Sequence, residues 1–129
     1  MPAIDDATRD ELVSACRTAT GDSLRSVTHF TPDSYEQVYL RSDLERDADL
    51  ESFVSTEQTG FDEQRTYRNS ELGEYGFTIR VFEEGYVTRV VDGDNDEGVF
   101  VTTDALGLNG FREVATAIRG VFDGARPAP

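Results

Sequence analysis

The chain has a single cysteine and a single histidine, and together they could form a thiolate–imidazole pair. In such a pair Cys16 would be the nucleophile and His29 its base. Cys16, however, falls on one helical stripe with Leu12 and Ala19, and buried cysteine usually behaves as a small apolar side chain. Nothing near it in sequence marks an activated thiol. We therefore predict that Cys16 belongs to the core and that this pair is not a catalytic site.

An acidic segment at 92–98 suggests a cation site, because alternate carboxylates could converge on calcium. The EF-hand pattern requires glycine at the sixth position and glutamate at the twelfth. Counted from Asp92, those positions hold Glu97 and Thr103. We favour a hydrated turn between two strands and predict no metal ligands. Without lysine, Schiff-base chemistry and the usual phosphate-binding P-loop are excluded, so we also predict no cofactor.

Arginines flank a tyrosine at Arg65, Tyr67 and Arg68. Two guanidinium groups in one loop could hold an anionic ligand through bidentate hydrogen bonds. Pairing of these arginines with neighbouring carboxylates of the same loop is the alternative, and we favour it. The sequence contains too many carboxylates for an acid–base catalytic pair to be selected among them.

Twelve arginines and no lysine stand against twenty-six Asp and Glu, for a net charge of −14. This balance predicts the cytoplasm of a salt-accumulating archaeon, with molar K⁺ and Cl⁻ as solvent, because lysine exposes a long apolar stem. At about 1 M salt the Debye length is about 3 Å, so repulsion among carboxylates is screened. No dense basic cluster and no long apolar run occur. We therefore predict a cytoplasmic protein with neither nucleic-acid nor membrane partners.

The first half of the chain predicts two helices separated by a hairpin. Thr8 and Glu11 have capping-box spacing, and we expect a helix over about 8–20. Residues 24–30 and 35–40 are rich in β-branched and aromatic residues, and 31–34 suits a turn. Ser42 and Glu45 form a second capping box, which predicts a helix that includes Ala48 and ends before Gly60.

The second half predicts a long loop, three strands and a helix. Residues 61–73 are polar and without a period, which is typical of a loop. Residues 75–81 and 86–91 form a hairpin around a three-residue loop, with Gly85 at a positive φ. A fifth strand covers 99–103. Asn109 is the expected cap of the last helix, whose apolar residues have helical spacing: Phe111, Val114, Ala115, Ile118, Val121 and Phe122.

The predicted hairpin separates two faces. A three-residue loop pairs Phe82 with Tyr86, Arg80 with Thr88, and Thr78 with Val90. Aromatic residues and arginine are enriched at protein interfaces, so we predict an interaction surface at Arg80, Phe82, Tyr86 and Thr88. The alternatives are that a helix covers this face or that a shorter loop shifts the register. The opposite face holds the expected core, in which Arg89 is the one polar residue: Phe77, Ile79, Val81, Val87 and Val91.

The order α-β-β-α-β-β-β-α predicts an α+β fold with one five-stranded antiparallel sheet and three helices packed on it. We expect one domain over 1–129, with an ordered core at about 5–123 and a frayed tail at 124–129. This topology resembles roadblock and profilin-like domains, which implies protein assembly or signalling, and is also similar to PAS-like sensors. The stretches TATGDSLRSVTHF, YLRSDLERDADL and GYVTRVVDGDNDEG resemble small acidic haloarchaeal proteins of unknown function.

These observations predict a non-enzymatic, cytoplasmic protein-interaction or regulatory domain, with a protein partner that is a second copy or another chain, and a homodimer as the expected state. One alternative is a sensor of an anionic metabolite, held at Arg65 and Arg68 between the sheet and the 61–73 loop. A further alternative is an enzyme that uses carboxylates as acid and base.

Overall fold

The computed structural model describes residues 4–44, 50–61 and 63–124. One five-stranded antiparallel sheet has the order β2-β1-β5-β4-β3, so that strands from the two halves of the chain meet at its centre. The predicted α+β class and the order α-β-β-α-β-β-β-α are confirmed. The strands are β1 (Leu24–Phe30), β2 (Tyr35–Leu40), β3 (Thr78–Val81), β4 (Tyr86–Asp92) and β5 (Glu97–Thr103).

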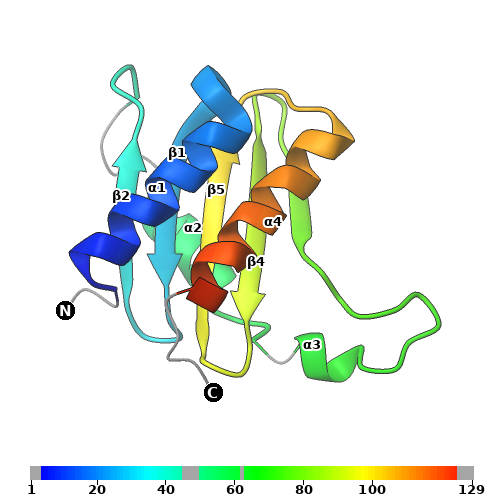
Figure 1. Ribbon diagram of the computed structural model, residues 1–129. Coiled ribbons are helices and arrows are strands. Elements are labelled where there is room, and N and C mark those ends of the chain that lie inside the picture. Colours follow the sequence, from blue (N-terminus) through cyan, green and yellow to red (C-terminus); the bar gives the residue numbers. More distant parts are fainter. Residues whose placement is uncertain (1–3, 45–49, 62, 125–129) are drawn as a thin grey trace.

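Helices α1 (Asp6–Thr20) and α4 (Leu108–Gly124) lie side by side across one face of the sheet, which we call the two-helix face (Figure 1). The short helix α2 (Leu50–Glu57) lies behind the sheet, on what we call the opposite face (Figure 1). A single-turn helix, α3 (Glu63–Thr66), follows it within the segment that the sequence predicted as loop. The predicted cap residue Glu45 and Ala48 lie outside the described residues, as does the predicted tail beyond Gly124.

The helix ends differ from the predicted caps by a few residues. Asp5, not Thr8, caps α1, because its carboxylate accepts a hydrogen bond from the Thr8 N–H at 2.7 Å. This bond lowers the pKa of the Asp5 carboxyl. The helix ends at Gly21, whose φ of 61° favours glycine. Asn109 does not cap α4 but lies within its first turn.

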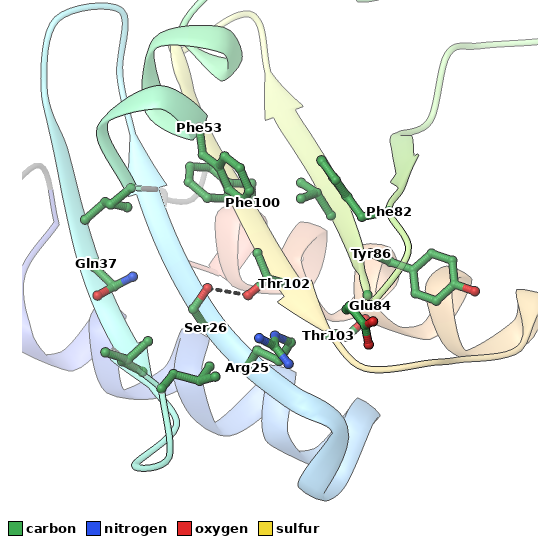
Figure 2. Close-up of a pocket in the computed structure, with 15 residues that line it drawn as sticks. Arg25, Ser26, Gln37, Phe53, Phe82, Glu84, Tyr86, Phe100, Thr102 and Thr103 are labelled. Atoms are coloured by element: carbon green, nitrogen blue, oxygen red, sulfur yellow. Dashed lines mark hydrogen bonds between the residues drawn. The ribbon is translucent and has the colours of Figure 1, made fainter. Parts of the chain in front are cut away.

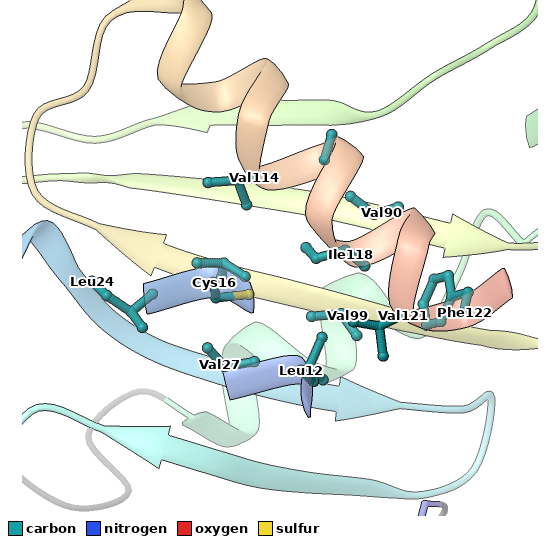
Figure 3. Packing of buried hydrophobic residues seen from close by; sticks show 12 residues of the cluster. Leu12, Cys16, Leu24, Val27, Val90, Val99, Val114, Ile118, Val121 and Phe122 are labelled. Atoms are coloured by element: carbon teal, nitrogen blue, oxygen red, sulfur yellow. The ribbon is translucent and has the colours of Figure 1, made fainter. Parts of the chain in front are cut away.

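The main core lies between the sheet and the two long helices (Figure 3). The six apolar residues predicted for α4 are all buried, which confirms the helical spacing. Leu12 and Cys16 bring α1 onto Val27 of β1 and Val99 of β5 in the same cluster. A second, smaller cluster on the opposite face lies under α2 and contains Phe30, Leu50, Val54, Val87, Val91 and Phe100.

The predicted register of the β3–β4 hairpin is wrong. Its loop has four residues, 82–85, closed by the Phe82 N–H, which donates to the Gly85 carbonyl at 2.9 Å. Val81 therefore pairs with Tyr86, and Arg80 with Val87. Gly85 does not have a positive φ; a Cβ there would lie 2.5 Å from the Thr103 carbonyl oxygen, so the close approach of the loop to β5 requires glycine.

The corrected register places the predicted core residues of β3 differently. Ile79 and Val81 lie on the other face from Val87, and Val81 is 73% exposed. Strand β3 also begins at Thr78 rather than at 75. The Arg119 guanidinium of α4 donates to the carbonyls of Gly76 at 2.6 Å and Val91 at 3.2 Å, and so occupies acceptors at the point where the ladder would continue.

Candidate functional site

The opposite face of the sheet is covered unevenly, and a groove of about 250 Å³ remains beside α2 (Figure 2). Helix α2 has eight residues, too few to span the sheet. The β3–β4 loop borders the groove on one side and the end of β2 on the other. Its apolar lining comes from Leu40, Leu44, Leu50, Phe53, Phe82, Val87 and Phe100.

Aromatic rings form the wall of the groove nearest to α2. The Phe53 ring stacks on Phe82, with centroids 5.7 Å apart, and meets Phe100 edge-on at 6.5 Å. These contacts join α2, the hairpin loop and β5 around one cavity. Phe82 remains 48% exposed, so the wall has an open outer rim.

The floor of the groove is polar. Ser26 of β1 and Thr102 of β5 face each other, and their hydroxyls are hydrogen-bonded at 2.5 Å (Figure 2). The Gln37 carboxamide points into the groove from β2 (Figure 2) and makes no hydrogen bond to the part of the chain that the structure describes. Arg25 and Glu84 line its lower end.

An arginine clamp closes that lower end. Arg41 donates to Asp104 at 2.6 Å and to Asp43 at 2.6 Å, which fixes the segment that leads into α2. Arg25 donates to the same Asp104 at 3.0 Å. The bonds from Arg41 and then Arg25 lower the pKa of the Asp104 carboxyl. The charge of Arg25 is therefore already balanced within the chain.

A buried charge cluster holds α2 and α3 on the sheet. The Arg89 guanidinium of β4 contacts Glu57 at 3.2 Å and Glu63 at 2.6 Å. It also donates to the main-chain carbonyls of Glu57 and Thr59 at the end of α2. Arg80 binds the other side of the Glu57 carboxylate at 2.8 and 3.0 Å. Arg89 and Glu57 are each 2% exposed, so the prediction of Arg89 as a polar residue in the core is confirmed.

The predicted interaction residues do not share one face. Thr88 is fully buried on the two-helix face, and the Tyr86 ring packs against Phe111 of α4 at 5.1 Å. Arg80 and Phe82 lie instead on the side of α2. The cause is the four-residue loop, which moves each residue of β3 by one position relative to β4.

The predicted anion-binding residues lie outside the groove. Arg65 and Arg68 have exposed side chains at and just after α3. Tyr67, which is 51% exposed, stacks on Tyr75 at 5.8 Å. Binding of an anionic metabolite at these arginines stays a prediction, as does catalysis by a carboxylate pair.

Cys16 and His29 have separate surroundings. Cys16 is fully buried in the main core, whereas His29 Nε2 lies 3.2 Å from Glu97 Oε1. Residues 93–96 form the turn between β4 and β5, and Asn95 donates to Asp92 at 2.9 Å. Among the residues that the structure describes, no three His, Cys, Asp or Glu side chains are arranged to hold a metal ion.

We expect the Cys16 thiol to be unreactive in the native protein. Burial raises its pKa from 9.0 to about 12. The folded state therefore holds this proton more tightly than the unfolded chain, so its contribution to stability is complete below about pH 9 and is lost as the pH rises towards 12. A thiol reagent should label the protein only after denaturation, and Cys16→Ala should show a flatter alkaline decline in the free energy of unfolding. Rapid labelling of the native protein would contradict this burial.

Sequence reasoning missed the groove residues Arg25, Ser26, Gln37 and Thr102. A signal was present in β1 and β5, where Ser26 and Thr102 occupy positions that alternate with Val27 and Val101. Small hydroxyl residues on one face of two central strands indicate a face that is not packed under a large apolar helix. None of the helices in the described ranges is long and apolar enough to cross a membrane.

Comparisons with known proteins match nearly the whole of this architecture. The family model described as "Domain of unknown function (DUF7522)" matches residues 10–123. No curated protein matches the chain. Solved structures of the protein MglB share the fold, which supports the roadblock-like topology.

Three such structures have nearly the same length as this chain. MglB of Myxococcus xanthus has a TM-score of 0.62 at 10% identity, covering 99% of this chain and 98% of that one. The gliding protein MglB of Thermus thermophilus has a TM-score of 0.60 at 9% identity, covering 97% and 99%. A structure described as MglB with tetrameric arrangement has a TM-score of 0.60 at 10% identity, covering 98% and 99%.

Proposed function

The chain belongs to the DUF7522 family, whose description names no activity, and from this premise we propose that it is a non-enzymatic protein-interaction domain that self-associates. The observation that carries the proposal is the apolar end of the edge strand β3. Val81 is 73% exposed and Phe82 is 48% exposed, next to a strand that is paired on one side. Such edges are templates for pairing with another chain unless charge or proline protects them.

A two-fold dimer is the arrangement that this edge favours. If β3 of one copy pairs antiparallel with β3 of another, each copy presents the same Val81–Phe82 strip to the other. The oligomeric description of one MglB structure supports self-association of a fold of this kind. Of the four surface residues predicted from sequence, Arg80 and Phe82 remain in the proposed interface, while Tyr86 and Thr88 serve packing beneath α4.

The proposed setting is the cytoplasm of a salt-accumulating archaeon. The support is the net charge of −14 and the use of arginine without lysine. In molar salt, charge repulsion between two acidic copies is screened within about 3 Å, so apolar contact decides whether they associate. Self-association should therefore be measured in molar potassium chloride.

We expect Val81→Ser combined with Phe82→Ser to weaken the dimer by about tenfold or more, because both changes remove apolar surface from the centre of the proposed interface. Size-exclusion chromatography with light scattering, at several protein concentrations, measures the change. Leu72→Ser is the matched control, because Leu72 is 99% exposed and lies outside the proposed interface strand. A wild-type monomer at every concentration, or an unchanged dimer in the double variant, would contradict the proposal.

A further inference from the structure

The groove beside α2 has the composition of a small-molecule site. It combines three aromatic rings and three leucines with a polar floor, within about 250 Å³. Sites for drug-sized ligands usually start at about 300 Å³, so the groove suits a compound of one or two rings. The open rim at Phe82 gives such a compound a way in from solvent.

The polar groups of the lining determine which functional group would be bound. Gln37 offers both a donor and an acceptor to the groove, and no described residue uses them. The Ser26 and Thr102 hydroxyls bond to each other at 2.5 Å, and each retains further acceptor capacity. A carboxamide or hydroxyl group, which both donates and accepts, matches this floor.

The charges of the lining argue against an anion. Arg25 already binds Asp104 at 3.0 Å, and Glu84 adds a carboxylate at the same end of the groove. The chain as a whole carries a net charge of −14. A negatively charged ligand would therefore meet repulsion without a free cation in the lining to offset it.

We propose that this groove binds a small neutral amphipathic molecule, with a planar apolar ring against Phe53, Phe82 and Phe100 and a carboxamide or hydroxyl group at Gln37, Ser26 and Thr102. This site is distinct from the predicted anion site at Arg65 and Arg68. It also goes beyond self-association, because it requires no second copy of the chain.

Indole-3-acetamide is a suitable probe, because it joins a planar ring to a neutral carboxamide. The chain has no tryptophan, so indole fluorescence reports the probe alone. Titration of the probe with protein in molar potassium chloride should show saturable binding. Indole-3-acetate, which differs by its negative charge, should bind more weakly, and so should 3-methylindole, which lacks the polar group.

Three variants locate the binding. Thr102→Leu fills the floor and should abolish saturable binding, whereas Thr116→Leu, the same change on the exposed side of α4, should leave it unchanged. Gln37→Leu should weaken indole-3-acetamide about two- to tenfold, as expected for one lost hydrogen bond, and leave 3-methylindole unaffected. Circular dichroism and the thermal midpoint check the fold of each variant; if Thr102→Leu is unfolded, the partly exposed Gln37 decides.

Several outcomes would overturn the proposal. These are the absence of saturable binding to the wild-type protein, equal affinity for indole-3-acetate, and equal weakening by Thr116→Leu. Light scattering on the probe-saturated protein provides a further test. If the probe converts a dimer into monomers, the groove is occupied by a second copy and not by a small molecule.

Discussion

Replacement of Arg89 by methionine is expected to lower the free energy of unfolding by about 3–5 kcal/mol, the usual cost of removing one partner of a buried ion pair. Glu57, which is 2% exposed, would keep only the partly exposed Arg80 as its counter-charge. The carbonyls of Glu57 and Thr59 would also lose the donor that Arg89 supplies. Denaturant unfolding in molar potassium chloride measures the change.

Two comparisons make this expectation specific. Arg68→Met removes an exposed arginine and should change the free energy of unfolding little. Combining Arg89→Met with Glu57→Met should cost less than the sum of the two single changes, because no buried charge is left without a partner. A loss for Arg89→Met no larger than that of the Arg68 control would contradict the buried cluster.

The second large effect is expected for Phe30→Ala, at about 3–5 kcal/mol of unfolding free energy. The Phe30 ring is fully buried, and its centroid lies 5.6 Å from Phe61 and 5.9 Å from Phe100. The Arg89 guanidinium lies 5.8 Å from the same ring. Truncation would leave a cavity beneath α2 and remove the ring on which the arginine rests.

Tyr35→Ala is the matched control for Phe30→Ala. Tyr35 is the cross-strand partner of Phe30 in β2, and it is 46% exposed. The same measurement should show a much smaller loss for this variant, because little surface is removed from the interior. Equal losses for the two variants would show that strand pairing, not the packing of the ring, determines the cost.

The elements that repeat a strong period were predictable from sequence. The six apolar residues of α4 have helical spacing, and burial of all six follows from it. The strands β1 and β2 lie at the residues expected from their composition. Arg89 stood out because it interrupts an apolar strand, although its partners Glu57 and Glu63 come from a segment without any clear period.

The hairpin and the groove could not be predicted in this way. One additional residue in the β3–β4 loop reverses which face each β3 side chain occupies, and nothing in residues 82–85 distinguishes a three-residue from a four-residue loop. The groove depends on how far α2 extends over the sheet and on how closely Gly85 approaches β5. Both are properties of tertiary packing between segments that are distant in sequence.

The side-by-side placement of α1 and α4 has a consequence for how the chain folds. The central strand pair joins β1 to β5, from Leu24 opposite Thr103 to Phe30 opposite Gly98, and the helices that cover it come from opposite ends of the described chain. Each of these contacts must close a long loop, and proteins dominated by such distant pairings fold slowly. During synthesis the main core would stay open until α4 has left the ribosome, so the first helix and its apolar stripe would wait for the last.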